Sequence, residues 1–169
     1  MEFRKTINAN LQKEDKISVF SFILKAYSLA IQDYPKINSL YYPDKPYECE
    51  IHSSHNISIA IDTLNGLIAP NIKDVQNKSI LEVQRSIIDL RDKADKVQVG
   101  GQDLFGGTSA LSNIGTIGGT YASPLNLPNQ VCIVALGKVK ESPSFVQRVN
   151  PYGGNLDAIQ MKKTVRIIF

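Results

Sequence analysis

Residues 108–120 join a short strand pattern to a glycine-rich turn, and this combination constrains the fold more than any other stretch. Thr108, Ala110 and Ser112 fall on one side of the expected strand and the intervening residues on the other, the two-residue period of a β-strand. The glycines that follow are expected to reach positive φ and to approach a bound group closely. A serine at such a strand end can donate a hydrogen bond to an oxyanion. The alternative is a glycine-rich hairpin with a solvated serine.

Two long helices are predicted before this stretch. Ser18 is placed as the N-cap of a helix over 19–31, whose apolar positions 20, 23, 24, 27 and 31 repeat with the helical period. Pro35 ends that helix. Ser79 is expected to cap a second helix that runs from Ile80 to about Lys96, and residues 1–11 resemble the end of another helix.

Strand patterns fill most of the remaining chain. Strands are predicted over 40–42, 47–52, 56–62, 67–69 and 130–137, the last of them a continuous apolar run typical of a buried strand. Residues 64–66 and 150–155 are expected to be turns, and 156–169 a final strand. Two helices and six or more strands indicate an α/β (α+β) fold, with a mixed sheet and helices on one face.

Composition excludes several classes of protein. The 169 residues suit a single domain, and a net charge of +3 is far from the dense basic clusters of nucleic-acid binders. Cys49 and Cys132 lack zinc-site spacing, so we expect no metal. No apolar run reaches 18 residues, so no membrane span is expected.

Several short motifs together resemble one enzyme family. They are Ser112 to Thr120, the prolines Pro124 and Pro128, Ala135 to Lys138, Ser54 to Ile57, Ile59 to Thr63, and Gly66 to Ile68. In this order and spacing they resemble the catalytic domain of the dihydrolipoamide acyltransferases, the E2 core subunits of 2-oxoacid dehydrogenase complexes. The branched-chain E2 is the most similar type, and the resemblance covers nearly the whole chain.

The resemblance implies a fold, a reaction and partners. It implies a chloramphenicol-acetyltransferase-like open-faced sandwich that forms trimers, and a homotrimer that assembles into a larger cubic core. The implied reaction moves an acyl group from a dihydrolipoyl thiol to coenzyme A, with the lipoyl group carried on a separate lipoyl domain. The implied partners are E1 and E3 subunits, and the implied location is the mitochondrial matrix, or the cytoplasm in a bacterium.

The resemblance also assigns roles to individual residues. Ser112 matches the serine that stabilises the tetrahedral oxyanion from a neighbouring subunit. The positions that match coenzyme A contacts are Arg4, Ser18, Asp62, Asn113 and Gly137. Asp62 can equally cap the tight turn that follows it, and Arg4 can be simply solvated. Arg91 stands where the family often has glutamine.

The family's general base is missing from the sequence. His52 and His55 are the only histidines, and neither begins the family's His-x-x-x-Asp-Gly motif. We therefore expect residues 1–169 to be one acyltransferase domain that lacks its N-terminal start and its C-terminal motif. One explanation is an incomplete sequence of a working enzyme, and the other is a non-catalytic structural core subunit. A stand-alone trimeric acetyltransferase of the same fold is a third possibility.

Overall fold

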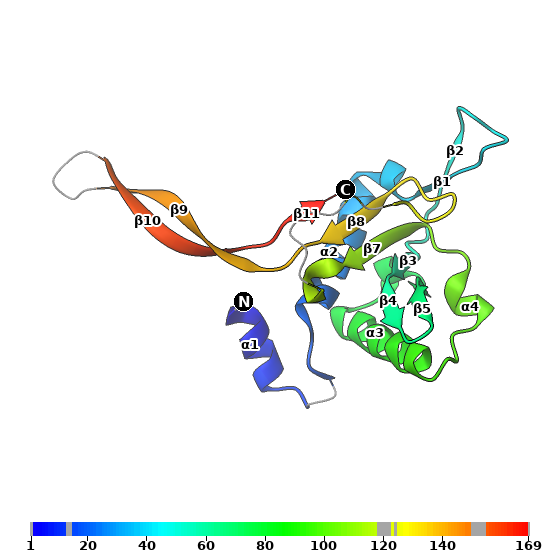
Figure 1. Ribbon diagram of the computed structural model, residues 1–169, viewed down its shortest axis with the longest axis horizontal. Helices are drawn as coiled ribbons and strands as arrows, with labels where there is room; N and C mark the ends of the chain where they lie inside the picture. The colour runs from blue at the N-terminus through cyan, green and yellow to red at the C-terminus, as the bar shows by residue number, and fades with distance from the viewer. Residues whose placement is uncertain (1, 13–14, 118–122, 124, 150–154, 169) are drawn as a thin grey trace.

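A five-stranded mixed sheet forms the centre of the molecule (Figure 1). The computed structural model describes residues 2–12, 15–117, 123, 125–149 and 155–168. The sheet order is β11-β8-β7-β3-β6, with bounds Ile167–Ile168, Ile133–Leu136, Ser109–Asn113, Ile57–Ile59 and Asn71–Ile72. Strands β3, β7 and β8 are parallel, while β6 and β11 pair antiparallel at the two edges. The predicted mixed sheet is confirmed.

Both long helices begin where the sequence predicts. Helix α2 covers Val19–Asp33, and the Ser18 side chain accepts a hydrogen bond from the Ser21 amide. Helix α3 covers Ile80–Asp95, where Ser79 and Glu82 form a capping box. Each cap satisfies amides that the first helical turn leaves without intrahelical partners.

The two helices cover one face of the sheet. Residues paired across neighbouring strands share a face, so Ile59, Leu111 and Val134 point to the same side. These three residues belong to one buried cluster with apolar residues of α2 and α3. The same face carries Ser109, whose hydroxyl lies 2.5 Å from the Tyr27 hydroxyl of α2. Helices on one face of the sheet are therefore confirmed.

Shorter elements surround this core. The chain contains helices α1 (Glu2–Ala9) and α4 (Gly101–Leu104), the 3₁₀ turns η2 (Pro35–Ile37), η3 (Val75–Asn77) and η4 (Ile114–Thr116), and two hairpins, β1 (Ser39–Tyr41) with β2 (Cys49–Ile51) and β4 (Ile61–Thr63) with β5 (Gly66–Ile68). The single strand predicted over 56–62 is wrong in one respect, because Ala60 divides it. Its first half joins the central sheet as β3, and its second half pairs with β5.

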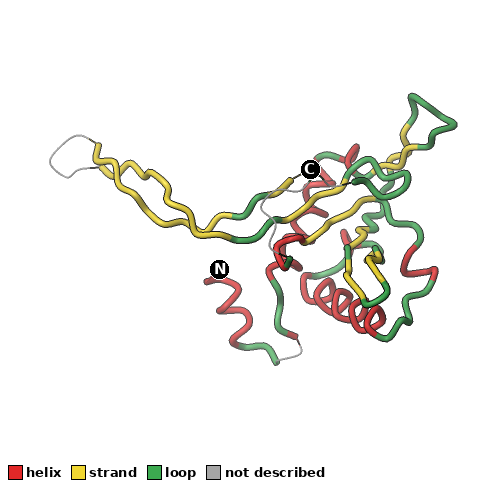
Figure 2. Tube along the Cα trace, viewed as in Figure 1, coloured by secondary structure: helices red, strands yellow, loops and turns green. Residues whose placement is uncertain are grey.

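The C-terminal strand prediction also needs correction. Strands β9 (Lys140–Val149) and β10 (Asn155–Thr164) form a ten-residue antiparallel hairpin, which we call the arm. Figures 1 and 2 show the arm extending away from the sheet and helices. The predicted strand over 156–169 is therefore two strands, because the chain leaves the arm after Thr164 and pairs with β8 as β11. Residues 150–154 of the predicted turn, and Phe169, lie outside the described residues.

Candidate functional site

Ser112 lies near the C-terminal end of β7. The neighbours of this strand, β3 and β8, both run parallel to it. On β8 its partner is Ala135, and the next residue, Asn113, pairs with Leu136. Successive strand residues point to opposite faces, so Asn113 belongs to the helix-covered face and Ser112 to the other face. The carboxyl ends of parallel strands are the usual position of binding sites in open sheets.

The turn after β7 is built by close contact between backbones. Asn113 Oδ1 accepts a hydrogen bond from the Gly115 amide at 3.2 Å. A Cβ atom on Gly115 would lie 2.9 Å from the Gly137 carbonyl oxygen, so a side chain would force the two segments apart. Among the described glycines only Gly66 and Gly106 have positive φ. The prediction of positive φ is thus wrong for Gly115. Glycine is required there because the Gly137 backbone leaves no room for a side chain. Gly118 and Gly119 lie outside the described residues.

A cavity of about 420 Å³ opens beside Ser112, and we call it the Ser112 cavity. Its polar lining comes from β4, α3 and the end of β7, with Asp62, Arg91, Asp95, Ser112 and Asn113. Within the described chain the Ser112 hydroxyl makes no hydrogen bond, and the residue is only half-buried. Asp62 is exposed at the cavity wall. The structure therefore brings Ser112, Asn113 and Asp62 together at one cavity.

A second cavity, of about 310 Å³, lies on the other side of the turn, and we call it the Gly137 cavity. Its lining includes Gly137, Lys138, Gly115 and the N-terminal turn of α2. Asn113 and Phe20 line this cavity as well as the Ser112 cavity. Two separate openings therefore meet at the end of β7.

A third hollow, of about 340 Å³, lies on the sheet face opposite the helices, and we call it the alanine groove. Its lining is Ser58, Ala60, Leu67, Ala69, Ala110, Leu111, Ser112, Ile114, Ser123, Leu125, Leu127, Ile133 and Ala135. Ser112, Ala60, Leu67 and Ile114 also line the Ser112 cavity. Ser112 is therefore shared by a polar cavity and an apolar groove.

Two predicted contact residues, Arg4 and Ser18, do not line these hollows among the described residues. Arg4 lies on α1, with Nη1 3.5 Å from the Ile17 carbonyl oxygen and with Nε buried and unpartnered. Ser18 caps α2, and its amide donates to Gln84 Oε1 at 2.9 Å. The Gly137 cavity begins one residue further along, at Val19.

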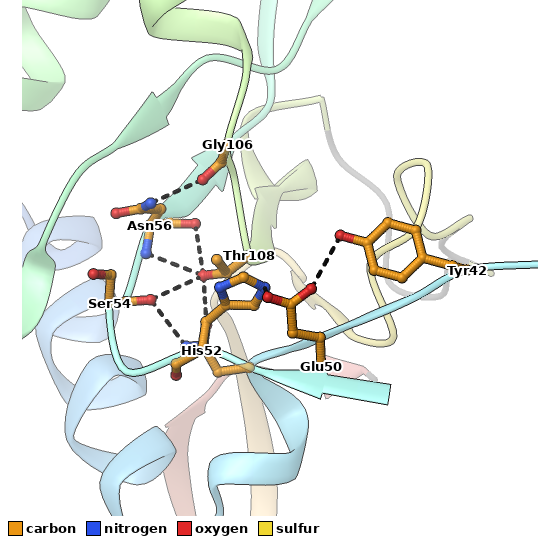
Figure 3. A network of polar contacts seen from close by, with 8 residues as sticks. Tyr42, Glu50, His52, Ser54, Asn56, Gly106 and Thr108 are labelled. Atoms are coloured by element: carbon orange, nitrogen blue, oxygen red, sulfur yellow. Dashed lines mark hydrogen bonds and ion pairs between the residues drawn. The ribbon is translucent and has the colours of Figure 1, made fainter. Parts of the chain in front are cut away.

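Neither histidine is placed to act on Ser112. His55 is 5% exposed, and its Nδ1 lies 2.8 Å from the Ser28 hydroxyl. Burial, followed by the charge of Lys25, lowers the pKa of His55. His52 Nε2 lies 3.8 Å from Glu50 Oε1, in the polar network of Figure 3. Neither residue lines a described hollow, so these histidines serve the structure around β2 and α2.

The network in Figure 3 anchors the beginning of β7 rather than the end that carries Ser112. The Thr108 hydroxyl accepts from the Asn56 amide at 3.1 Å and donates to Asn38 Oδ1 at 2.6 Å. Asn56 Nδ2 donates to the Gly106 carbonyl at 2.8 Å. These contacts fix the start of β7 against β3, and so they set the position of Ser112 four residues later.

The described residues contain no group of three or more metal-ligating side chains, and no described helix is long and apolar enough to cross a membrane.

Sequence reasoning missed two features of the site. Phe20, one of the periodic apolar positions of α2, is only half-buried and lines both the Ser112 cavity and the Gly137 cavity. The small residues Ala60, Ala110 and Ala135 form the groove, and their alternation with larger residues was the available signal.

Known proteins of similar sequence match most of this chain. Residues 1–166 match the family model described as 2-oxoacid dehydrogenases acyltransferase (catalytic domain). The lipoamide acyltransferase component of the branched-chain alpha-keto acid dehydrogenase complex, mitochondrial, of Caenorhabditis elegans is 40% identical over 158 residues, 93% of this chain and 35% of that protein. The Mus musculus counterpart is 40% identical over 153 residues, 90% of this chain and 32% of that protein. The chain thus spans about a third of these relatives.

Solved structures show the same fold. The Azotobacter vinelandii dihydrolipoamide acetyltransferase superposes with a TM-score of 0.84 at 26% identity, over 98% of this chain and 65% of that one. That structure comes from work on a serine, a histidine and an asparagine in its catalytic mechanism. The cubic core of a pyruvate dehydrogenase multienzyme complex gives the same TM-score, 0.84, at the same identity, 26%, over 98% of this chain and 65% of that one.

Proposed function

We propose a function for this chain from one premise: it belongs to the family of the 2-oxoacid dehydrogenase acyltransferases, and it matches their catalytic domain. The proposed reaction is transfer of an acyl group from a dihydrolipoyl thiol to coenzyme A in a branched-chain type of complex. Coenzyme A acts as a substrate, and the lipoyl group arrives on a separate lipoyl domain. The single observation that carries this proposal is that Ser112 lines two hollows, the Ser112 cavity and the alanine groove, because a transfer between two thiols needs two approaches to one reacting carbonyl.

The role proposed for Ser112 follows from the chemistry of thioester exchange. The sulfur of one thiol attacks the thioester carbonyl, a carbon–sulfur bond forms, and the carbonyl oxygen becomes an oxyanion. The tetrahedral intermediate then expels the other sulfur as a thiolate, which takes up a proton. A Ser112 hydroxyl that donates to the oxyanion stabilises this intermediate, an effect of about 2.7–4 kcal/mol for a single donor.

Coenzyme A contacts are proposed for Asp62, Asn113 and Gly137, which line these cavities, and for Arg4 and Ser18, which do not. Asp62 and Asn113 face the Ser112 cavity, while Asn113 and Gly137 face the Gly137 cavity. Such polar groups suit a ligand with amides. Arg91, in the Ser112 cavity, adds a guanidinium that can bind phosphate.

The base that deprotonates the attacking thiol is not one of the described histidines. A thiol with a pKa near 8.5 is mostly protonated at neutral pH, so efficient transfer needs a positioned base. The family resemblance implies a histidine in a His-x-x-x-Asp-Gly motif, which the 169 residues do not contain. We infer that residues 1–169 alone are inactive and that a longer chain with this motif is active.

The second candidate function is that of a non-catalytic structural core subunit, which the position of both histidines away from Ser112 favours. Two measurements separate the candidates. Coenzyme A binding is measured by calorimetry, and transfer from S-acyl dihydrolipoamide is measured for the 169-residue chain and for one extended by the motif. Activity in the extended chain but not in the 169-residue chain supports the enzyme function. An assembled but inactive extended chain supports the structural subunit, and activity of the short chain shows that the proposed base is wrong.

Assembly and location complete the proposal. Relatives named above belong to mitochondrial complexes, and a structural neighbour is a cubic core. We propose a homotrimer that builds a larger core, with E1 and E3 subunits as partners, in the mitochondrial matrix, or in the cytoplasm if the source is bacterial.

A further inference from the structure

The β1–β2 hairpin projects from the body of the domain at the end opposite to the arm (Figure 1), and none of its strand residues lines the three hollows. The Tyr41 amide of β1 donates to the Asn129 carbonyl at 2.7 Å. The Val131 amide donates to the Ser39 carbonyl at 3.3 Å, so residues 129–131 flank β1 on one side. On its other side β1 pairs with β2. Strand β2 is therefore the outer strand, and all three of its residues are exposed.

The outer edge of β2 carries backbone groups without partners. The His52 amide donates to the Asn38 carbonyl at 3.0 Å, which makes these two residues a hydrogen-bonded pair in line with the antiparallel ladder. Such pairs alternate with non-hydrogen-bonded pairs, so Cys49 and Ile51 direct their N–H and C=O groups away from β1. Among the described residues, no group forms a hydrogen bond with these four backbone groups. An edge of this kind is a template for pairing with another extended chain.

The two faces of this edge differ in chemistry. Tyr41, Cys49 and Ile51 share one face, because they are paired or alternate residues of the hairpin. Tyr41 is 43% exposed and Ile51 is 51% exposed, so this face presents apolar surface. Glu50 lies on the opposite face, and Glu48 directly precedes the strand; both are exposed. A chain that pairs with β2 therefore meets apolar side chains on one face and a carboxylate on the other.

Charge disfavours a second copy of β2 as the occupant of this edge. Antiparallel self-pairing centred on Glu50 places Glu50 opposite Glu50 of the other copy. Self-pairing centred on Cys49 places Glu48 opposite Glu50. Like charges directly opposite one another are destabilising, whereas a strand with lysine or arginine at these positions forms opposite-charge pairs.

We propose that β2 docks a partner protein by strand addition, and that the docked segment is extended and alternates basic with apolar residues. The backbone groups of Cys49 and Ile51 form the hydrogen bonds, which provide affinity. Tyr41 and Ile51 contact the apolar side chains, and Glu48 and Glu50 select the basic ones. This interaction is independent of the proposed reaction, because the strands of the hairpin lie outside the three hollows.

The test is a calorimetric titration of the 169-residue chain with two synthetic peptides. Acetyl-KVKVKVK-amide is the probe, and acetyl-EVEVEVE-amide has the same length and apolar residues with the opposite charge. The basic peptide should bind roughly tenfold more tightly, because its lysines pair with carboxylates that repel glutamate. Hydrogen exchange at the amides of Cys49 and Ile51 should slow when the basic peptide binds. Equal affinity for the two peptides, or no binding of the basic one, would overturn the proposal.

A proline on the free edge locates the binding. Cys49→Pro removes one outward amide and leaves the ladder with β1 in place, since proline is accepted in edge strands. It should weaken binding of the basic peptide roughly tenfold, because a main-chain hydrogen bond is lost and the ring blocks the edge. Cys49→Val is the matched control, because it keeps the amide and should bind as the unaltered chain does. Unchanged binding in a Cys49→Pro protein that circular dichroism shows to be folded would contradict strand addition.

Charge reversal tests the selectivity and decides the matter if Cys49→Pro does not fold. Glu48→Lys combined with Glu50→Lys should reverse the preference, so that the acidic peptide binds more tightly. Asp33→Lys combined with Asp92→Lys makes the same change at two exposed helix positions and should keep the original preference. A preference that survives in the glutamate variant would overturn the proposal.

Light scattering of the Cys49→Pro protein tests the other occupant. Because the proposed partner is a different protein, the mass should equal that of the unaltered chain. A smaller assembly would show that β2 joins copies of this chain, and that result would also overturn the docking of a foreign segment.

Discussion

At the scale of single residues, Ser112 is the proposed transition-state donor. Its hydroxyl makes no hydrogen bond within the described chain, and the residue lines both the Ser112 cavity and the alanine groove. In a chain that carries the His-x-x-x-Asp-Gly motif, Ser112→Ala should lower kcat by roughly 10²–10³ with little change in coenzyme A affinity. Steady-state kinetics and calorimetry check this. A variant that loses affinity but keeps kcat would place Ser112 in ground-state binding instead.

Asp62 is a proposed coenzyme A contact that is exposed and lines the Ser112 cavity. Its carboxylate can accept a hydrogen bond from a pantetheine amide, and bonds to charged groups contribute about 1.5–3 kcal/mol. Asp62→Ala should therefore weaken coenzyme A binding about tenfold in calorimetry. Asp89→Ala removes the same charge from the exposed surface of α3, where Asp89 pairs with Lys93, and should bind as the unaltered chain does. Equal affinity in both variants would remove Asp62 from the site.

His55 makes stability depend on pH. Burial lowers its pKa below the usual value of 6.5, so the unfolded chain takes up this proton at a higher pH than the folded chain does. The free energy of unfolding should therefore fall as the pH drops below about 6.5, and this contribution should be constant above it.

Urea unfolding at several pH values between 5 and 8 measures this effect. His55→Gln should lose the part of the pH dependence below about 6.5. His52→Gln leaves the His55 site intact, so it is the control and should keep that dependence. Parallel curves for the unaltered chain and His55→Gln would show that other groups cause the acid sensitivity.

At the scale of elements, the ends of β7 and β8 are held together by Gly115 and Gly137. Gly115→Ala places a methyl group 2.9 Å from the Gly137 carbonyl oxygen, so the turn must shift. Overpacking of this kind costs about 1–3 kcal/mol, and urea unfolding should show that loss. Gly100→Ala is the matched control, because a Cβ there meets nothing within 4 Å. A Gly115→Ala protein as stable as this control would show that the two loops separate easily.

At the scale of the whole molecule, the arm gives a physical reason for assembly. Its two strands pair with each other over ten residues and extend beyond the domain (Figure 1). An isolated two-stranded hairpin is at best marginally stable in water, so an arm of this length is expected to pack on another surface.

A second copy of the chain is the partner that the proposed trimer provides. We expect light scattering to find at least a trimer at micromolar concentration. Replacing residues 141–163 with a short glycine-serine turn should reduce the mass to that of a monomer, while circular dichroism retains the helical signal. A stable monomer of the unaltered chain would count strongly against the proposed assembly.

The sequence alone determined the local features of this protein. Ser18 and Ser79 cap α2 and α3 as predicted, and the apolar run at 130–137 contains the buried strand β8. Caps and buried runs depend on neighbours in the chain, so their residue types reveal them. The motif around Ser112 was identified by its resemblance to a known family.

Only the tertiary structure decided which distant residues share a site. It brought Asp62 and Arg91 to Ser112 and placed both histidines away from the turn. It also divided two predicted strands, at Ala60 and after Thr164, because strand partners rather than local propensity determine where a strand ends. The alanine groove exists only because three strands align their small residues on one face, and register across strands is not written in local sequence.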